Sequence, residues 1–197
     1  TIISTGMYSS SDVGKAVSVL ETVGNPEIVL LHCVTSYPTT ASEVNLNAMV
    51  FLREKFNLLT GYSDHTVGYH VPLAAVALGA TVVEKHISLD FDVPNAQDWK
   101  VSCGPHDLKH FIDQLREVEK SLGRPEKVST QSEATNKQWA LKSLVVTRNV
   151  KAGETVDKSM LTVKRPGTGI SPDQISRILG RTLTVNKISD AILNWDD

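Results

Sequence analysis

Two stretches of the sequence, GYSDHT at residues 61–66 and VVEKHI at residues 82–87, each place a histidine at the end of a short apolar run. Short, continuously apolar runs that alternate with helical patterns are typical of buried parallel strands. The runs of this kind lie at residues 1–4, 28–33, 58–62 and 81–86. The quoted stretches therefore predict that His65 and His86 follow two consecutive strands of one parallel sheet.

Helical spacing of apolar residues separates and follows these runs. The first predicted helix has Ser10 or Ser11 as N-cap and Gly24 as C-cap. The second covers residues 42–56 and is opened by Ser42, and the third covers residues 69–79. The fourth covers residues 108–122 and is stopped by Gly123. A doubly wound sheet can accommodate four such units. However, polar residues follow each strand, as they do on the active-site face of a (β/α) barrel. Because half a barrel leaves open sheet edges, we expect the chain to be the C-terminal part of a longer protein.

The organisation changes after the fourth helix. Residues 123–142 are polar and lack periodicity, which predicts a linker. From Ser143 onward, short β-type runs at 143–148, 160–165 and 182–186 alternate with turn residues, with one brief helical signal at 171–180. The sequence thus predicts a half barrel at 1–122, a linker at 123–142 and a small, mostly β domain at 143–197.

Composition excludes several classes of protein. The net charge of −2 and the absence of a Lys/Arg block argue against a nucleic-acid partner. Apolar stretches such as residues 71–83 fall short of the roughly 20 residues that a membrane helix needs, so we expect a cytoplasmic protein with no membrane partner. Cys33 and Cys103 lack metal-site spacing and a secretory context, which favours reduced thiols.

His65 and His86 are the strongest candidates for chemistry, because the carboxyl ends of consecutive parallel strands meet at one rim. Two neutral imidazoles suit a first-row divalent ion and leave positions for water and a substrate oxygen. Such a site would polarise a carbonyl group. The alternative is that each histidine is an ordinary hydrogen-bonded loop residue.

Other polar residues surround the same predicted rim. Five residues at this rim either hold a phosphate or carboxylate through hydroxyl and backbone groups, or are ordinary turn residues. They are Ser4, Thr5, Gly6, Thr35 and Ser63. Glu84 and Asp98 are the carboxylates nearest His86 in sequence and are candidates for acid–base or positioning work. Arg165 either presents its guanidinium to a polar ligand or belongs to a surface turn. We expect packing or solvated roles for the remaining histidines, His32, His70, His106 and His110.

The sequence resembles the sialic acid synthases, both in several segments and in their order along the chain. These enzymes condense phosphoenolpyruvate with an N-acetylated hexosamine such as N-acetylmannosamine. The matching segments are IISTGM (2–7), LLHCVTSYPT (30–39), GYSDHT (61–66), AAVALGATVVEKHISLD (74–90), REVEKSLG (116–123) and LTVKRPGTGI (161–170). The resemblance implies a TIM-type (β/α)8 barrel, of which only the last four β/α units are present, followed by an antifreeze-like (β-clip) domain. It implies release of phosphate and formation of a nine-carbon 2-keto-3-deoxy acid of the sialic type.

The resemblance also implies roles for individual residues. His65 and His86 would bind Mn²⁺, with Mg²⁺ or Co²⁺ as alternatives, and phosphoenolpyruvate would be held by Ser4, Thr35 and Ser63. The residues implied at the sugar site are Tyr37, Asp98, Trp139 and Arg165, the last two supplied across a domain-swapped homodimer. Asp98 lies in PNAQD, where the family has PGPD. Because the first four barrel strands are absent, we expect these 197 residues alone to be inactive.

Two alternative functions remain open at this point. One is a non-catalytic fragment that binds carbohydrate or protein. The other is a related phosphoenolpyruvate aldol-type synthase with a phosphorylated sugar acceptor. The sequence also leaves open which hexosamine the synthase would use, so that the product could be of the sialic, legionaminic or pseudaminic type.

Overall fold

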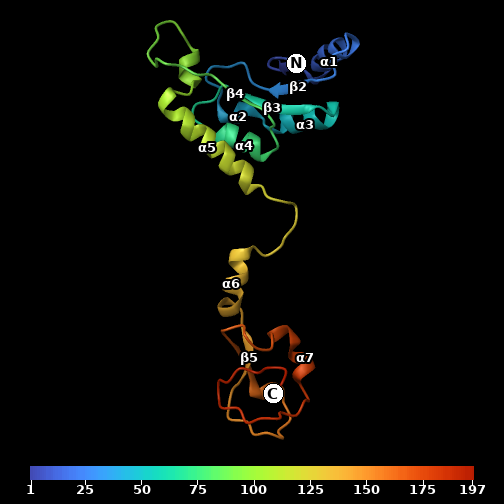
Figure 1. The fold of residues 1–197 in the computed structure, drawn as a ribbon. Coiled ribbons are helices and arrows are strands. Elements are labelled where there is room, and N and C mark those ends of the chain that lie inside the picture. Colours follow the sequence, from blue (N-terminus) through green and yellow to red (C-terminus); the bar gives the residue numbers. More distant parts are fainter. The chain divides into compact units, whose positions relative to one another are not determined.

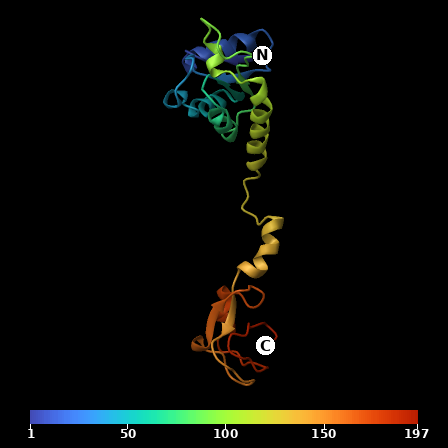
Figure 2. The same ribbon diagram turned by 90° about the vertical axis from the view of Figure 1, so that its left-hand side faces the viewer.

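The computed structural model describes all 197 residues, which form two compact units, Thr1–Arg124 and Pro125–Asp197. The first unit holds a four-stranded parallel sheet with its helices (Figure 1). The second holds a pair of antiparallel strands among long loops (Figure 2). None of the helices in either unit has the length and apolar character needed to cross a membrane.

The sheet of the first unit confirms the four predicted strands. They are β1 (Ile2–Ser4), β2 (Val29–His32), β3 (Leu59–Asp64) and β4 (Val83–Lys85). All three pairings are parallel, and the strands lie in chain order from β1 to β4. An α/β half barrel has this strand order, and its carboxyl ends form one rim.

Helix α1 (Ser10–Thr22) begins one or two residues earlier than the sequence predicts. Ser9, not Ser10 or Ser11, is the N-cap, because its side chain accepts a hydrogen bond from the backbone N–H of Asp12. At the other end, Gly24 adopts a φ of +81° just after the C-cap residue Val23. This left-handed conformation favours glycine, so Gly24 follows the helix end, but the C-cap is Val23 and not Gly24 as predicted.

The single helix predicted at 42–56 is two helices. They are α2 (Ala41–Val44) and α3 (Asn47–Phe56), and the break lies at Asn45, whose φ is +48°. Asparagine tolerates the left-handed conformation better than most residues, and that conformation cannot continue a right-handed helix. The apolar spacing across the break hides it from a periodicity argument.

The remaining helices of the first unit are α4 (His70–Ala77), the short 3-10 helix η1 (Asp98–Val101) and α5 (Pro105–Ser121). Helix α5 lies alongside α4 (Figure 1). The buried residues form two clusters between the sheet and its helices: Val13, Val17, Ile28, Leu30 and Leu52 in one, and Val44, Met49, Tyr62, Val71 and Ala75 in the other. These clusters place the helices on one face of the sheet.

The opposite face of the sheet is open near its amino end. Leu58 packs with the helices, and side chains alternate along a strand, so Leu59 points to the other face. Ile2 and Leu59, both on that face, are 58% and 59% exposed although they are large and apolar. The same alternation carries polar side chains to this face further along β3 and β4.

The second unit begins with helix α6 (Gln131–Ala140), which lies within the stretch predicted to be a linker. A capping box explains it, because Thr130 accepts a hydrogen bond from the N–H of Glu133 while the Glu133 carboxylate accepts one from the N–H of Thr130. The helix has no buried residue, and for that reason its sequence has no stripe of apolar residues that would have predicted a helix.

The mostly β part follows. It contains β5 (Ser143–Val146), paired antiparallel with β6 (Leu161–Lys164), and the short helices η2 (Lys158–Met160), η3 (Pro172–Gln174) and α7 (Ile175–Ile178). The run at 182–186 does not form the predicted strand, and only an isolated bridge joins Thr155 to Thr182. A core holds the loops together, with Leu144, Val146, Val150, Ile170 and Leu193 at most 1% exposed.

Candidate active site

Two registered cross-strand pairs, and the pair of histidines that follows them just beyond the strands, mark the carboxyl ends of β3 and β4. The register pairs Ser63 with Glu84 and Asp64 with Lys85, and one residue further along each chain come His65 and His86. Because the side chains alternate, the first and third pairs belong to the face opposite the helices, and the second pair belongs to the helix side.

His65 and His86 converge as the strand order predicts. Their ring centroids are 5.3 Å apart and their planes are inclined at 55°. His65 is buried, whereas His86 is partly exposed. The two strands thus bring two imidazoles together at one point of the rim.

The hydrogen bonds of His65 determine which ring nitrogen carries the hydrogen and which carries the lone pair. Nδ1 lies 2.7 Å from the carbonyl oxygen of Val34, which can only accept, so Nδ1 carries the hydrogen. Nε2 therefore accepts, and the hydroxyl of Tyr37 donates to it at 3.1 Å. Metal-binding histidines commonly donate their second N–H to a backbone carbonyl in this way.

The pair of imidazoles fits a two-histidine metal site. Nε2 of His65 could ligate an ion once Tyr37 releases it, and no ring hydrogen bond engages His86. No group of three or more His, Cys, Asp or Glu side chains in the chain is placed to hold a metal. An ion at this point would take its other ligands from water or substrate oxygens.

Tyr37 covers the histidine pair. Its ring centroid lies 4.2 Å from that of His65 and 5.6 Å from that of His86. Burial raises the pKa of the Tyr37 phenol, and the charge of Asp98 raises it further, so the hydroxyl stays a donor at neutral pH. Asp98 opens η1 and is exposed, and its side chain contacts neither histidine through a hydrogen bond.

Ser63 and Glu84 lie one step deeper on the same face. Ser63 Oγ donates to Glu84 Oε1 at 2.6 Å. Ser63 is 3% exposed, whereas Glu84 is exposed. A carboxylate at this position can accept or return a proton beside the histidines.

The first two strands supply further polar groups to the rim. Ser4 ends β1 and is exposed, and Thr35 is exposed in the loop after β2. Any side chain at Gly6 would collide with Thr35 Oγ1, so glycine allows these two loops to approach closely. Thr5 differs from these groups because it is buried and donates to Leu31 O at 3.1 Å, which is a structural role.

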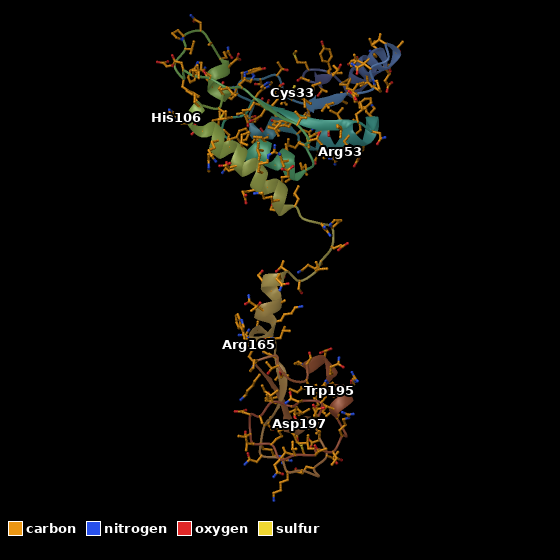
Figure 3. The ribbon with its side chains drawn as sticks, in the orientation of Figure 1. Cys33, Arg53, His106, Arg165, Trp195 and Asp197 are labelled. Carbon is orange, nitrogen blue, oxygen red and sulfur yellow. The ribbon has the colours of Figure 1, made fainter.

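Arg165 and Trp139 belong to the second unit. Arg165 Nε donates to Ala140 O at 2.9 Å, at the end of α6 (Figure 3). Trp139 is 59% exposed, and its indole N–H donates to Asn136 Oδ1 at 3.3 Å. The structure therefore brings the Arg165 side chain to the turn of α6 that carries Trp139, and the guanidinium keeps its other donors.

The remaining histidines and both cysteines have the roles predicted for them. His32 is buried and its Nε2 lies 2.7 Å from Val44 O, which makes it a hydrogen-bonded core residue. The others lie on helices: His70 on α4, and His106 and His110 on α5. Cys33 and Cys103 are free and buried, and burial raises the pKa of the Cys33 thiol.

Sequence reasoning missed the ion pair between Asp64 and Lys85. Lys85 Nζ lies 2.7 Å from Asp64 Oδ2, and the two side chains are 6% and 0% exposed. The signal was present, because each of the two charged residues immediately precedes a histidine on neighbouring strands.

Comparison with known proteins identifies the family. The NeuB family matches residues 1–127, and the SAF domain matches residues 142–197. The chain belongs to the NeuB family. The NeuB match covers the half barrel and every strand-end residue described above, and the SAF match covers the mostly β part of the second unit.

Relatives of this NeuB-family chain include several synthases. An N,N'-diacetyllegionaminic acid synthase from Campylobacter jejuni is 42% identical over 98% of the chain and 58% of its own length. A pseudaminic acid synthase from the same species is 34% identical over 100% of the chain and 57% of its own length. The crystal structure of an N-acetylneuraminic acid synthetase from Leptospira borgpetersenii, in complex with citrate, is 36% identical, with a TM-score of 0.61 over 68% of this chain and 47% of that one. The chain thus spans less than two thirds of each of these relatives.

Proposed function

We propose that the protein condenses phosphoenolpyruvate with an N-acetylated hexosamine, giving a nine-carbon 2-keto-3-deoxy acid and phosphate. The observation that carries this proposal is the strand-end set of His65, His86, Ser63 and Glu84 on one sheet face of a NeuB-family chain. The relatives, which are named as synthases of legionaminic, pseudaminic and N-acetylneuraminic acids, support the class of product.

The reaction requires a nucleophilic carbon and an electrophilic aldehyde to be held together. C3 of phosphoenolpyruvate attacks the aldehyde carbon of the open-chain sugar, which leaves an oxocarbenium ion at C2. Water adds at C2, and phosphate then departs by cleavage of its C–O bond. Fixed dipoles in a site closed to water stabilise this charge separation better than mobile solvent does.

Residues of this chain would divide the work along the rim. Ser4, Thr35 and Ser63 would hold phosphoenolpyruvate through their hydroxyl groups. Glu84 and Asp98 would give a proton to the aldehyde oxygen and take one from the attacking water. A Mn²⁺ ion held by His65 and His86, or else Mg²⁺ or Co²⁺, would polarise the aldehyde carbonyl.

We further propose that the whole protein completes a (β/α)8 barrel and forms a domain-swapped homodimer. The SAF domain of one protomer would cover the barrel rim of its partner, where Arg165 and Trp139 would contact the sugar. On this proposal, the 197 residues alone do not turn over. The exposed apolar side chains of Ile2 and Leu59 support a larger barrel, since a closed barrel would bury them.

The proposed function can be tested with the whole protein, phosphoenolpyruvate and a panel of acceptors. N-Acetylmannosamine, diacetamido hexoses and a phosphorylated hexosamine would be compared by phosphate release and by the mass of the acid formed. We expect turnover with a non-phosphorylated N-acetylated hexosamine, loss of turnover in EDTA, and recovery with Mn²⁺. Phosphate release without any new acid, or full activity in EDTA, would refute the condensation or the role of the ion, respectively.

A further inference from the structure

The ion pair between Asp64 and Lys85 lies directly behind the two histidines of the candidate site. Asp64 precedes His65 at the end of β3, and Lys85 precedes His86 at the end of β4. The sheet register places the two charged residues opposite each other. The pair thus joins the two strand ends from which the imidazoles project.

The ion pair is closed to solvent and its hydrogen-bonding groups are occupied. Besides Asp64, the Lys85 ammonium donates to the carbonyl oxygens of Thr66 at 2.7 Å and Gly68 at 3.3 Å. The second carboxylate oxygen of Asp64 accepts from the backbone N–H of Thr66 at 2.9 Å and from its hydroxyl at 2.7 Å. The segment 64–68 therefore wraps around the ammonium, with His65 inside the wrapped segment.

Stability alone does not account for this arrangement. Desolvation offsets most of the attraction within a buried ion pair, and two apolar residues of similar volume commonly give an equally stable protein. Apolar residues would not hold the carbonyl groups of Thr66 and Gly68 or the N–H of Thr66. The distinctive effect of the pair is the fixed path of the backbone on both sides of His65.

We propose that Asp64 and Lys85 are positioning residues that set the separation and the ring orientation of His65 and His86. They act through the backbone, whereas Val34 O fixes the ring of His65 from the other side. This positioning role rests on the proposed function in one respect only, namely that the two imidazoles bind a divalent cation. The positioning of the rings can be measured without a cation.

The test replaces the pair with apolar residues in the whole protein, as Asp64→Leu with Lys85→Met. The protein is labelled with ¹⁵N-histidine, and the His65 signal is assigned by its loss in His65→Gln. At about pH 8, where a free imidazole is neutral, the nitrogen shifts report which tautomer His65 adopts. Leu52→Ala is the matched control, because Leu52 is buried in a cluster of the same unit that contains neither strand end.

We expect the parent protein to hold His65 as the Nδ1–H tautomer, and the double variant to fold but to show a mixture of both tautomers. The Leu52→Ala control should keep the parent tautomer. The proposal is overturned if the double variant keeps the parent shifts, or if the control disturbs them equally. If the double variant does not fold, Thr66→Val, which removes one hydrogen bond to Asp64, is examined in the same way, and unchanged His65 shifts then overturn the proposal.

Titration with Mn²⁺ separates this proposal from the proposed function. If the parent binds the ion through both histidines, the double variant should bind it at least about tenfold more weakly, as found for groups that orient metal ligands. Equal affinity in parent and double variant would overturn the positioning role. If the parent fails to bind Mn²⁺, the cation part of the proposed function is refuted, and the tautomer measurement still decides the positioning role.

Discussion

Tyr37 should compete with a metal ion for His65, and its removal should therefore strengthen metal binding. The Tyr37 hydroxyl donates to Nε2 of His65 at 3.1 Å, and the nitrogen has only one lone pair. An ion can use this lone pair only after the hydrogen bond breaks. The substitution Tyr37→Phe removes the competing donor and retains the ring that packs on both imidazoles.

The expected size of the effect follows from this single bond. A hydrogen bond of this kind contributes about 0.5–1.5 kcal/mol net, and tenfold in affinity corresponds to about 1.4 kcal/mol. Tyr37→Phe should therefore tighten Mn²⁺ binding by about two- to twelvefold. If Tyr37 also lines the sugar site, the same variant should raise the KM for the sugar acceptor while it lowers the Kd for the ion.

Electron paramagnetic resonance of free Mn²⁺ in titrations of the whole protein measures this affinity. Tyr69→Phe is the matched control, because the Tyr69 hydroxyl meets Cys103 Sγ at 3.4 Å and touches neither histidine. The control should leave the affinity unchanged. An unchanged or weaker affinity in Tyr37→Phe would refute the reasoning, since it would mean that the hydroxyl does not oppose the ion.

Two further substitutions test other parts of the account. Lys85→Met should lower the free energy of unfolding of the first unit by about 3–5 kcal/mol in urea titrations, because it leaves the Asp64 carboxylate buried without its partner. Lys109→Met, which breaks an exposed ion pair, should cost at most about 1 kcal/mol, and equal losses would contradict this account. For the swapped dimer, Arg165→Ala and His65→Ala should each be nearly inactive, but subunit exchange in an equal mixture should restore about a quarter of all sites. If exchange is verified and no activity returns, each Arg165 serves its own barrel or none.

Much of the half barrel could be predicted from the sequence because local patterns and tertiary structure agree there. The apolar runs are strands, and the alternation along β3 and β4 brings His65 and His86 together. The break at Asn45 was missed because apolar spacing continues across it. Helix α6 was missed because an exposed helix buries no stripe and depends on its cap at Thr130.

The sequence predicts which residues form the candidate site better than it predicts the contacts between them. Strand-end position identifies which side chains share a rim, but it cannot reveal that Tyr37 donates to His65 from a separate loop. The contact between Arg165 and the end of α6 joins residues 25 positions apart, one of them in a helix that the sequence had not indicated. Such contacts depend on the conformation of connecting segments, and hydrophobic periodicity carries no information about it.

We propose that the strand-end histidine pair is the centre of a condensing site. It is tested most directly by formation of the nine-carbon acid in the whole protein with His65→Gln, beside a His106→Gln control. His106 is exposed on α5 and its ring makes no hydrogen bond within the chain, so its substitution should leave acid formation at the parent rate. We predict that His65→Gln forms no detectable acid while its melting temperature stays near that of the control. Acid formation by His65→Gln at the rate of the His106→Gln control would contradict the claim.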